Sequence, residues 1–348
     1  MEIGIDSFAA VVSDPVTGEA LSAQDRLANL LEEIETADRA GVDSFGIGEH
    51  HRKEYLDAAP SLILAAAAAR TERIRLTSAV TVLSADDPVR VFQQYATLDL
   101  LSRGRAELVV GRGSSVEAFP LFGYDLADYD DLFAEKLDLL LALREQTEVT
   151  WSGRHRPALT GQGVFPRPVQ DPLPVWLGVG GTPQSFARAG VLGLPLMVAI
   201  IGGTFERFRP LVDLYREAGR QASHDPSALR VGVHAFGFVA DTTDAAIDAT
   251  WPGYLRLMST IGRERGWSPP HRGQYEAAAG PGGAYLIGDV DAVVAKARHV
   301  DDVLGGVDRL TFQMTNVLLP HDAMLRSIEL LGTEAAPRIR ADAAVAAR

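Results

Sequence analysis

The chain has 348 residues, with 33 basic and 46 acidic side chains and a net charge of −13 at pH 7. This acidic balance disfavours nucleic acid as a partner, because the phosphate backbone carries the same sign of charge. The lack of cysteine excludes disulfides, thiolate metal sites and cysteine nucleophiles. The chain contains no stretch of about 18 uncharged apolar residues, so no membrane span is predicted. No signal peptide is recognisable at the N-terminus. We therefore expect a cytoplasmic protein.

Short apolar segments alternate with amphipathic segments along the chain. Helix starts are marked by capping residues, for example Ser22 and the pair Asp87-Pro88. Eight segments are predicted strands: one begins near Ile3, and the others cover 42–47, 74–83, 106–110, 175–179, 196–200, 230–239 and 309–313. Strand–helix alternation indicates a parallel sheet, and eight such units favour closure. The sequence predicts an eight-stranded parallel (β/α)8 TIM barrel, with a doubly wound open sheet as the alternative.

Two segments interrupt this alternation. Residues 147–174 are rich in glycine and proline and suggest a hairpin, and the stretch from Trp267 to Gly283 reads as irregular. We expect insertions after strands four and seven. Residues 1–335 are predicted to form a single domain, followed by a C-terminal tail, 336–348. The alanine-rich part after Pro337 is expected to fray.

Glycines and polar residues gather where the predicted strands end. Gly48-Glu49-His50-His51 follows strand two, Ser78-Ala79 lies within strand three, and Arg112 sits between glycines after strand four. Strand five ends in Gly180-Gly181-Thr182-Pro183. Because the carboxyl ends of barrel strands form one edge, these residues are predicted to share an active site there.

The end of strand five has the features of an anion site. Gly180 and Gly181 would let the backbone approach a ligand closely, and Thr182 and Ser185 add hydroxyls at a helix start. Arg112 would supply a fixed positive charge. The alternative is an ordinary tight turn from strand to helix. Together with Arg112, the pattern favours a phosphate site.

His50 is the candidate general acid or base, because imidazole titrates near neutral pH. Adjacent residues of a strand point to opposite faces, so His51 is expected to be structural. A metal site is the alternative for Glu49, His50 and His51. We expect no metal, because adjacent histidines rarely chelate one ion and no clear third ligand follows.

Five motifs resemble those of the bacterial luciferase-like, flavin-dependent monooxygenases. They are Gly48-Glu49-His50-His51, Asp87-Pro88-Val89-Arg90, Leu98-Asp99 with Leu101-Ser102-Arg103-Gly104-Arg105, Gly111-Arg112-Gly113, and Gly193-Leu194-Pro195. Their order and spacing agree with that family over about residues 1–200. Beyond residue 200 the likeness is mainly architectural.

The resemblance implies a barrel that binds reduced FMN. It assigns His50 to the oxygen chemistry of the flavin, and Arg112, Thr182 and Ser185 to its phosphate. It also places a non-prolyl cis peptide at Ser78-Ala79, beneath the flavin. The resemblance also implies a homodimer. A separate flavin reductase is implied as a partner, since no nicotinamide fingerprint follows a strand.

This chain also departs from the family pattern. Arg52-Lys53 stands where an aromatic residue is common, and Gly111 replaces a reactive thiol, so light emission is not expected. The loop from Ser114 to Tyr124 is predicted to wall the substrate side, or else to form a small hydrophobic cluster. The stretch from Trp267 to Gly283 is predicted to be a lid, or else a connection without a catalytic role.

The predicted function is monooxygenation of a small organic substrate with reduced FMN and oxygen. One alternative is hydride transfer by a deazaflavin or FMN without oxygen, and another is a non-catalytic flavin-binding protein. A sugar-phosphate isomerase or aldolase is disfavoured, because Lys53 and Lys136 lie in a loop and a helix. The sequences of the loops do not indicate which substrate the protein binds.

Overall fold

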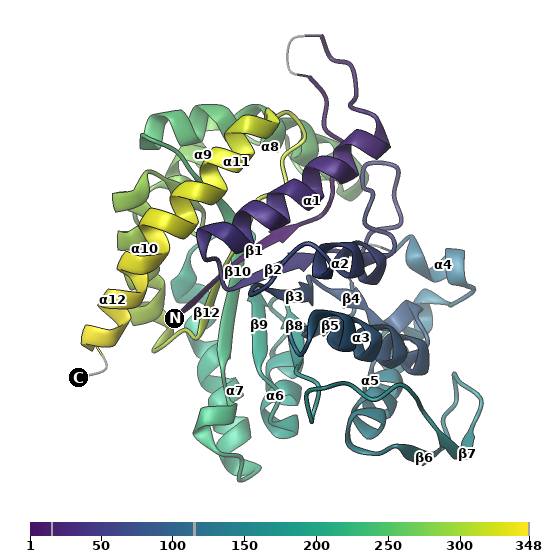
Figure 1. Ribbon diagram of the computed structural model, residues 1–348. Coiled ribbons are helices and arrows are strands. Elements are labelled where there is room, and N and C mark those ends of the chain that lie inside the picture. The colour runs from purple at the N-terminus through teal and green to yellow at the C-terminus, as the bar shows by residue number, and fades with distance from the viewer. Residues whose placement is uncertain (15–16, 114–115, 347–348) are drawn as a thin grey trace.

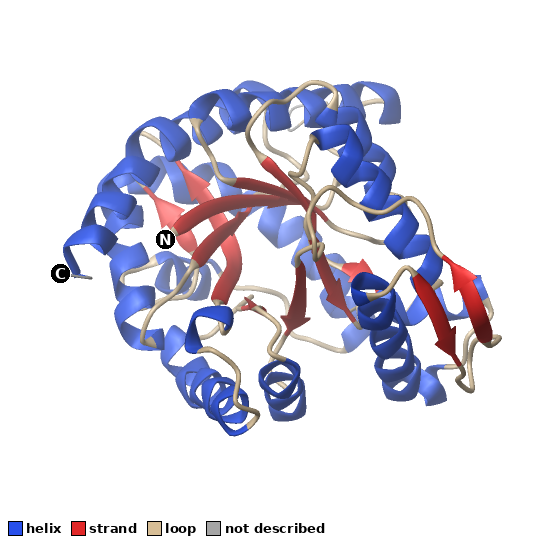
Figure 2. Cartoon of the chain, turned by 60° about the horizontal axis from the view of Figure 1, so that its bottom comes forward, coloured by secondary structure: helices blue, strands red, loops and turns tan. Residues whose placement is uncertain are grey.

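The computed structural model describes residues 1–14, 17–113 and 116–346 (Figure 1). Parallel strands form a nearly closed barrel surrounded by helices (Figures 1 and 2). The strands of the barrel run in the order β3-β2-β1-β12-β10-β9-β8-β5-β4. Their bounds are β1 Glu2–Ser7, β2 Ser44–Ile47, β3 Arg75–Ser78, β4 Thr81–Val82, β5 Leu108–Gly111, β8 Val175–Val179, β9 Leu196–Ala199, β10 Val231–Val239 and β12 Arg309–Gln313. The predicted barrel is confirmed.

The two edges of the sheet meet at residues 74–83, which the sequence predicts as a single strand. The predicted strand 74–83 is divided into β3, which pairs with β2, and β4, which pairs with β5. A backbone bridge between Leu76 and Ala106 also joins β3 to the segment that leads into β5. The predicted count of eight therefore treats β3 and β4 as one strand.

The helices begin where capping residues predict them. Ser22 accepts a hydrogen bond from the backbone of Asp25, and Gly41 ends that helix in a left-handed conformation with φ of 85°. The bounds are α1 Ala23–Ala40, α2 Pro60–Ala68, α3 Pro88–Ser102, α4 Ala118–Phe122, α5 Tyr129–Glu145, α6 Pro183–Leu192, α7 Arg209–Gln221, α8 Thr243–Arg265, α9 Arg272–Ala279, α10 Val290–Leu304, α11 His321–Leu330 and α12 Ala336–Ala346. Within the described residues, no helix combines the length and apolar character needed to cross a membrane.

The insertions after β5 and β10 are confirmed. The first includes α4 and, beyond α5, the antiparallel hairpin of β6 (Glu148–Trp151) and β7 (Leu159–Gly163), which lies outside the barrel (Figure 2). The second includes α9 and the short strand β11 (Leu286–Gly288), which pairs with β10. The expectation of an irregular stretch from Trp267 to Gly283 is wrong, because α9 forms there and buries Tyr275.

The C-terminal segment is helical rather than extended. A π-helical turn, Leu331–Ala335, leads directly into α12. Ala336 and Ile339 are buried, and the guanidinium of Arg340 donates to the carbonyl of Gly41 at 2.9 Å. The predicted boundary between residues 335 and 336 falls inside this helical run. The division into domain and tail remains a prediction.

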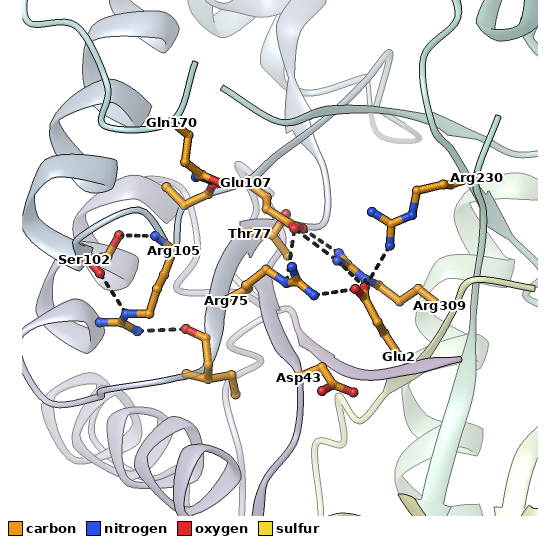
Figure 3. Close-up of polar contacts among 12 residues, drawn as sticks. Glu2, Asp43, Arg75, Thr77, Ser102, Arg105, Glu107, Gln170, Arg230 and Arg309 are labelled. Carbon is orange, nitrogen blue, oxygen red and sulfur yellow. Dashed lines mark hydrogen bonds and ion pairs between the residues drawn. The ribbon is translucent and has the colours of Figure 1, made fainter. Parts of the chain in front are cut away.

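A charged network closes the amino-terminal end of the barrel (Figure 3). The guanidinium of Arg309 is almost fully buried and lies 2.6 Å from Glu107 and 2.7 Å from Glu2. Arg75 and Arg230 also pair with Glu2. Burial lowers the pKa of Arg309, but the two carboxylates raise it above its usual value. This network of ion pairs forms the floor beneath the cavity described next.

Candidate active site

A cavity of about 900 Å³ opens inside the barrel, at the carboxyl ends of the strands. Seven of the eight predicted site residues line it: His50, Ser78, Ala79, Arg112, Gly180, Gly181 and Thr182. The eighth, Ser185, lies one turn into α6 and is hydrogen-bonded to Arg112. Residues far apart in the sequence are therefore brought to one site by the closure of the barrel.

The loop after β2 folds back so that Asp57 holds His50. Imidazole Nδ1 of His50 lies 2.9 Å from Oδ2 of Asp57, and the backbone N–H of His50 donates to Oδ1 at 3.1 Å. Burial raises the pKa of the fully buried Asp57, although its bonds to His50 act in the opposite direction. With Nδ1 fixed in this way, Nε2 of His50 is the ring nitrogen left for a ligand.

Gly48 makes room for this pair. A Cβ atom at Gly48 would lie 2.6 Å from the Phe8 ring and 2.8 Å from Oδ2 of Asp57. Phe8 also contacts the His50 ring, with 4.7 Å between ring centroids. A glycine is therefore required before the histidine pair so that the imidazole can sit against Asp57.

Glu49 and His51 support the loop. Oε1 of Glu49 lies 3.1 Å from Nε2 of His51, and Oε2 accepts from the backbone N–H of Val82 at 2.9 Å. The bond to Glu49 raises the pKa of His51, against the opposing effect of burial. These contacts fasten the loop after β2 to β4, and they occupy both side chains.

Ser78 has a structural role in this geometry. Its buried hydroxyl donates to the carbonyl of Val109 at 2.8 Å and accepts from the N–H of Val109 at 3.0 Å. The side chain thus bridges β3 and β5 where their backbones are not paired directly. Ser78 also lines the cavity, and its assignment to cofactor binding remains a prediction.

The cis peptide joins Ala79 and Val80, so the predicted position, Ser78-Ala79, is wrong by one residue. The side chain of Val80 projects toward β5 and β8. A Cβ atom at either Gly111 or Gly178 would lie 2.7 Å from that side chain. Gly111, which replaces the family's thiol, is thus needed to accommodate Val80.

Arg112, Thr182 and Ser185 form one cluster. Nη2 of Arg112 lies 3.4 Å from both hydroxyl oxygens, at the start of α6. The space around Gly180 and Gly181 is open, since a Cβ atom at either would meet nothing within 4 Å. Nη1 of Arg112 also pairs with Asp130 at 2.5 Å, a negative charge that the sequence did not predict at this site.

Helix α8 provides the apolar wall. Leu257, Met258 and Ile261 on α8 line the cavity, together with Trp267 just beyond it. Trp267 is the part of the predicted lid that reaches the cavity, whereas α9 packs its buried Tyr275 against Tyr254 of α8. The role of the stretch from Trp267 to Gly283 as a lid remains a prediction.

Arg52 joins three segments at the rim of the cavity. Its guanidinium pairs with Glu117 beside α4 at 2.5 Å and with Glu264 at the end of α8 at 2.6 Å. Ser114, the first residue of the loop predicted to wall the substrate side, lies outside the described residues. Within the described part of that loop, Ala118 lines the cavity and Phe122 packs edge-on against the His51 ring.

Several residues at the cavity were missed by sequence reasoning. His234 and Gln313 line the cavity, whereas Asp57 and Asp130 contact the lining residues His50 and Arg112. Asp57 and Asp130 are loop or helix-start carboxylates and carry no distinguishing local signal. His234 and Gln313 do carry one, because a polar side chain within a predicted buried strand of a barrel points to a site or a satisfied core group.

One group of potential metal ligands lies away from the cavity. Among the described residues, Asp128, Asp131 and His155 place ligand atoms within 4.8 Å of one another. The guanidinium of Arg154 already lies 2.8 Å from Asp128 and 3.5 Å from Asp131. These ion pairs account for the acidic cluster without an ion.

The fold and the cavity together describe a barrel with a carboxylate-paired histidine and an arginine–hydroxyl cluster at the carboxyl ends of its strands. The chain belongs to the luciferase-like monooxygenase family, whose sequence profile matches residues 1–303. It is 30% identical over 329 residues to the 4-hydroxyprotoasukamycin monooxygenase of Streptomyces nodosus subsp. asukaensis, covering 88% of this chain and 85% of that protein.

Solved structures with different cofactors share the fold. The oxygenating constituent of 3,6-diketocamphane monooxygenase from Pseudomonas putida, in complex with FMN, has a TM-score of 0.77 at 20% identity and covers 97% of this chain and 98% of its own. An F420-dependent secondary alcohol dehydrogenase, in complex with an F420–acetone adduct, has a TM-score of 0.75 at 19% identity. The match covers 97% of this chain and 99% of the dehydrogenase chain. At these identities the likeness concerns the fold alone.

Proposed function

We propose that this protein is a monooxygenase that uses reduced FMN and oxygen to oxidise a small organic substrate. The observation that carries the proposal is the union, in one cavity, of the Arg112–Thr182–Ser185 cluster with the His50–Asp57 pair. The family membership and the related monooxygenase support the oxygen chemistry. The FMN bound to a structural neighbour supports the choice of cofactor.

The cluster suits a phosphate monoester in charge and hydrogen bonding. Arg112 offers a planar set of donors, and Thr182 and Ser185 offer hydroxyls at the positive end of α6. Asp130 is a competing partner, but its side chain is 72% exposed and can turn to solvent. The open backbone at Gly180 and Gly181 leaves space for the ligand beside these groups.

The remaining residues would handle protons and exclude water. When bound, the reduced flavin would supply the electrons and the reaction with oxygen. Nε2 of His50 would give or take a proton at the reacting centre, while Asp57 holds Nδ1 and stabilises the protonated ring. The apolar wall of α8 would limit the access of water to the cavity.

Replacing Arg112 with alanine tests the phosphate site. We expect the affinity for FMN to fall by about 10- to 150-fold, as befits the loss of a charge-assisted bond of about 1.5–3 kcal/mol. Riboflavin lacks the phosphate, so its affinity should change less than about twofold on this argument. Flavin fluorescence titrations measure both constants.

Asp130→Asn is the matched control for this experiment. It removes the competing carboxylate from Arg112 and leaves the hydroxyl cluster in place. FMN should bind this variant at least as tightly as it binds the wild type. An equal loss of FMN and riboflavin affinity in Arg112→Ala would contradict the proposed phosphate site.

Hydride transfer by a deazaflavin is the second candidate function. The observation in its favour is the fold shared with the F420-dependent alcohol dehydrogenase. Oxygen consumption distinguishes the two reactions, because the monooxygenase consumes oxygen in forming its product and the hydride-transfer enzyme does not. A non-catalytic flavin-binding role is less well supported, because it gives no purpose to the His50–Asp57 pair.

We further propose a cytoplasmic homodimer supplied with reduced FMN by a separate flavin reductase. The alanine-rich helix α2 would allow close approach of a second copy, and its Leu62 is 71% exposed. Sedimentation of the wild type and of Leu62→Glu would test the role of this helix in association.

A further inference from the structure

Four polar side chains on the inner wall of the barrel have no role in the proposed chemistry. Asp6, His234, Thr311 and Gln313 come from the neighbouring strands β1, β10 and β12. In the strand register Asp6 pairs with Gln313, and His234 pairs with Thr311. All four line the cavity and are more than nine-tenths buried. They therefore form one polar patch on a single wall.

Asp6 and His234 form a second carboxylate–imidazole pair. Nδ1 of His234 lies 2.5 Å from Oδ2 of Asp6. Phe8 packs between this pair and the catalytic candidate, with its ring centroid 6.1 Å from that of His234 and 4.7 Å from that of His50. Gly46 leaves room for the carboxylate, since a Cβ atom there would lie 2.0 Å from Oδ1 of Asp6.

Gln313 and Thr311 carry buried polar atoms that the protein does not satisfy. Among residues 1–14, 17–113 and 116–346, no group bonds to Nε2 or Oε1 of Gln313 or to Oγ1 of Thr311. Burial of an amide without partners destabilises a folded protein. Such groups in a cavity wall are expected where a ligand supplies the missing bonds.

The charges around the patch indicate what kind of group it would take. Arg309 lies below it and also lines the cavity, but its guanidinium is already paired with Glu107 and Glu2. Among the described residues, the Asp6 carboxylate pairs with His234, and an anion bound at the patch would face the negative charge of this carboxylate. A neutral group with both hydrogen-bond donor and acceptor capacity fits the patch best.

We propose that Gln313, Thr311 and the Asp6–His234 pair form a recognition subsite for an uncharged group that both donates and accepts hydrogen bonds. A phenol or enol hydroxyl and the edge of a cyclic amide have this chemistry. The substrate could supply such a group, and so could the pyrimidine ring of the flavin. The inference rests on the proposed function in assigning substrate and flavin to this cavity.

The stability of Gln313→Met separates recognition from a structural role. Methionine has a similar size and shape but carries no buried amide. The thermal midpoint of the full chain should therefore equal or exceed that of the wild type. Met197→Leu, an apolar exchange in the same cavity, is the control. A clear fall in the midpoint of Gln313→Met with unchanged ligand binding would overturn the proposal.

Ligand recognition is measured with a matched pair of probes, 2-naphthol and 2-methylnaphthalene, which differ by a hydroxyl and a methyl. Each is titrated calorimetrically into the full chain with saturating FMN. We expect Gln313→Met to lose about fivefold of the wild-type preference for the naphthol, as for one hydrogen bond. FMN and riboflavin titrations of the same variant form the second arm.

The two arms identify the source of the group. Loss of the naphthol preference with unchanged flavin affinity assigns the subsite to substrate. An equal fall in FMN and riboflavin affinity assigns it to the flavin pyrimidine ring. If neither quantity changes, the subsite does not exist. Failure of the proposed function is distinguishable, because it appears in the wild type itself, as a lack of FMN binding or of oxygen-dependent oxidation of a substrate.

Discussion

Replacement of His50 by alanine should lower the turnover of substrate oxidation by about 10²- to 10⁴-fold, the usual contribution of a positioned general acid or base. The reason is geometric. Asp57 fixes Nδ1 of His50 at 2.9 Å and leaves Nε2 for the reacting centre of the cavity. The change should leave FMN affinity nearly intact, because the phosphate cluster lies on other strands. Turnover is measured with supplied reduced FMN, so that no reductase limits the rate.

Two further variants locate the effect in the pair. Asp57→Asn keeps the size of the side chain but removes its negative charge and replaces one of its two acceptor oxygens with an amide donor. Turnover should therefore fall less than in His50→Ala but still clearly. His51→Gln should have a smaller effect than either, because His51 contacts Glu49 within the loop. Unchanged turnover in His50→Ala would show that His50 has no part in the chemistry.

Removal of the Glu107 carboxylate should cost the fold about 3–5 kcal/mol in the free energy of unfolding, as measured for broken buried ion pairs. Glu107 lies 2.6 Å from the buried guanidinium of Arg309, and Arg75 is 3.3 Å away. In Glu107→Ala, Glu2 would be the one remaining carboxylate of the network for three arginines (Figure 3). Urea unfolding at neutral pH measures the loss.

Two controls show whether the loss of unfolding free energy comes from the burial of the charges or from ion pairing in general. Asp213→Ala breaks the exposed pair with Arg209 on α7 and should cost less than about 1 kcal/mol. The double replacement of Glu107 and Arg309 by methionine removes both buried charges, and should be less destabilising than Glu107→Ala alone. A loss in Glu107→Ala no larger than in Asp213→Ala would show that the network does not stabilise the barrel.

The fold was predictable where the signals are local. The bounds of β8, α6 and β12 agree with the apolar runs, the proline at the first helical position and the following glycine. The division of residues 74–83 into β3 and β4 was not predictable, because it depends on how two neighbouring strands meet at the closure. The same holds for α9, whose burial of Tyr275 depends on α8.

The residues of the site also differ in whether local sequence signals were enough to predict them. His50 and Arg112 stand directly after predicted strands, so the geometry of a barrel was enough to bring them together. Asp57 could not be found in this way, since it reaches His50 only because the loop after β2 folds back across seven residues. Gln313 required the inward register of β12, which follows from its pairing with β1 and β10.

The central claim is that reduced FMN and oxygen meet an organic substrate in this cavity. The most direct measurement supplies chemically reduced FMN and isotopically labelled oxygen gas to the wild type and to His50→Ala, with a panel of hydroxylated aromatic compounds and ketones. We predict that the wild type incorporates labelled oxygen into an organic product and that the variant loses this incorporation. A product formed by the wild type without oxygen, by hydride transfer from a reduced deazaflavin, would contradict the claim.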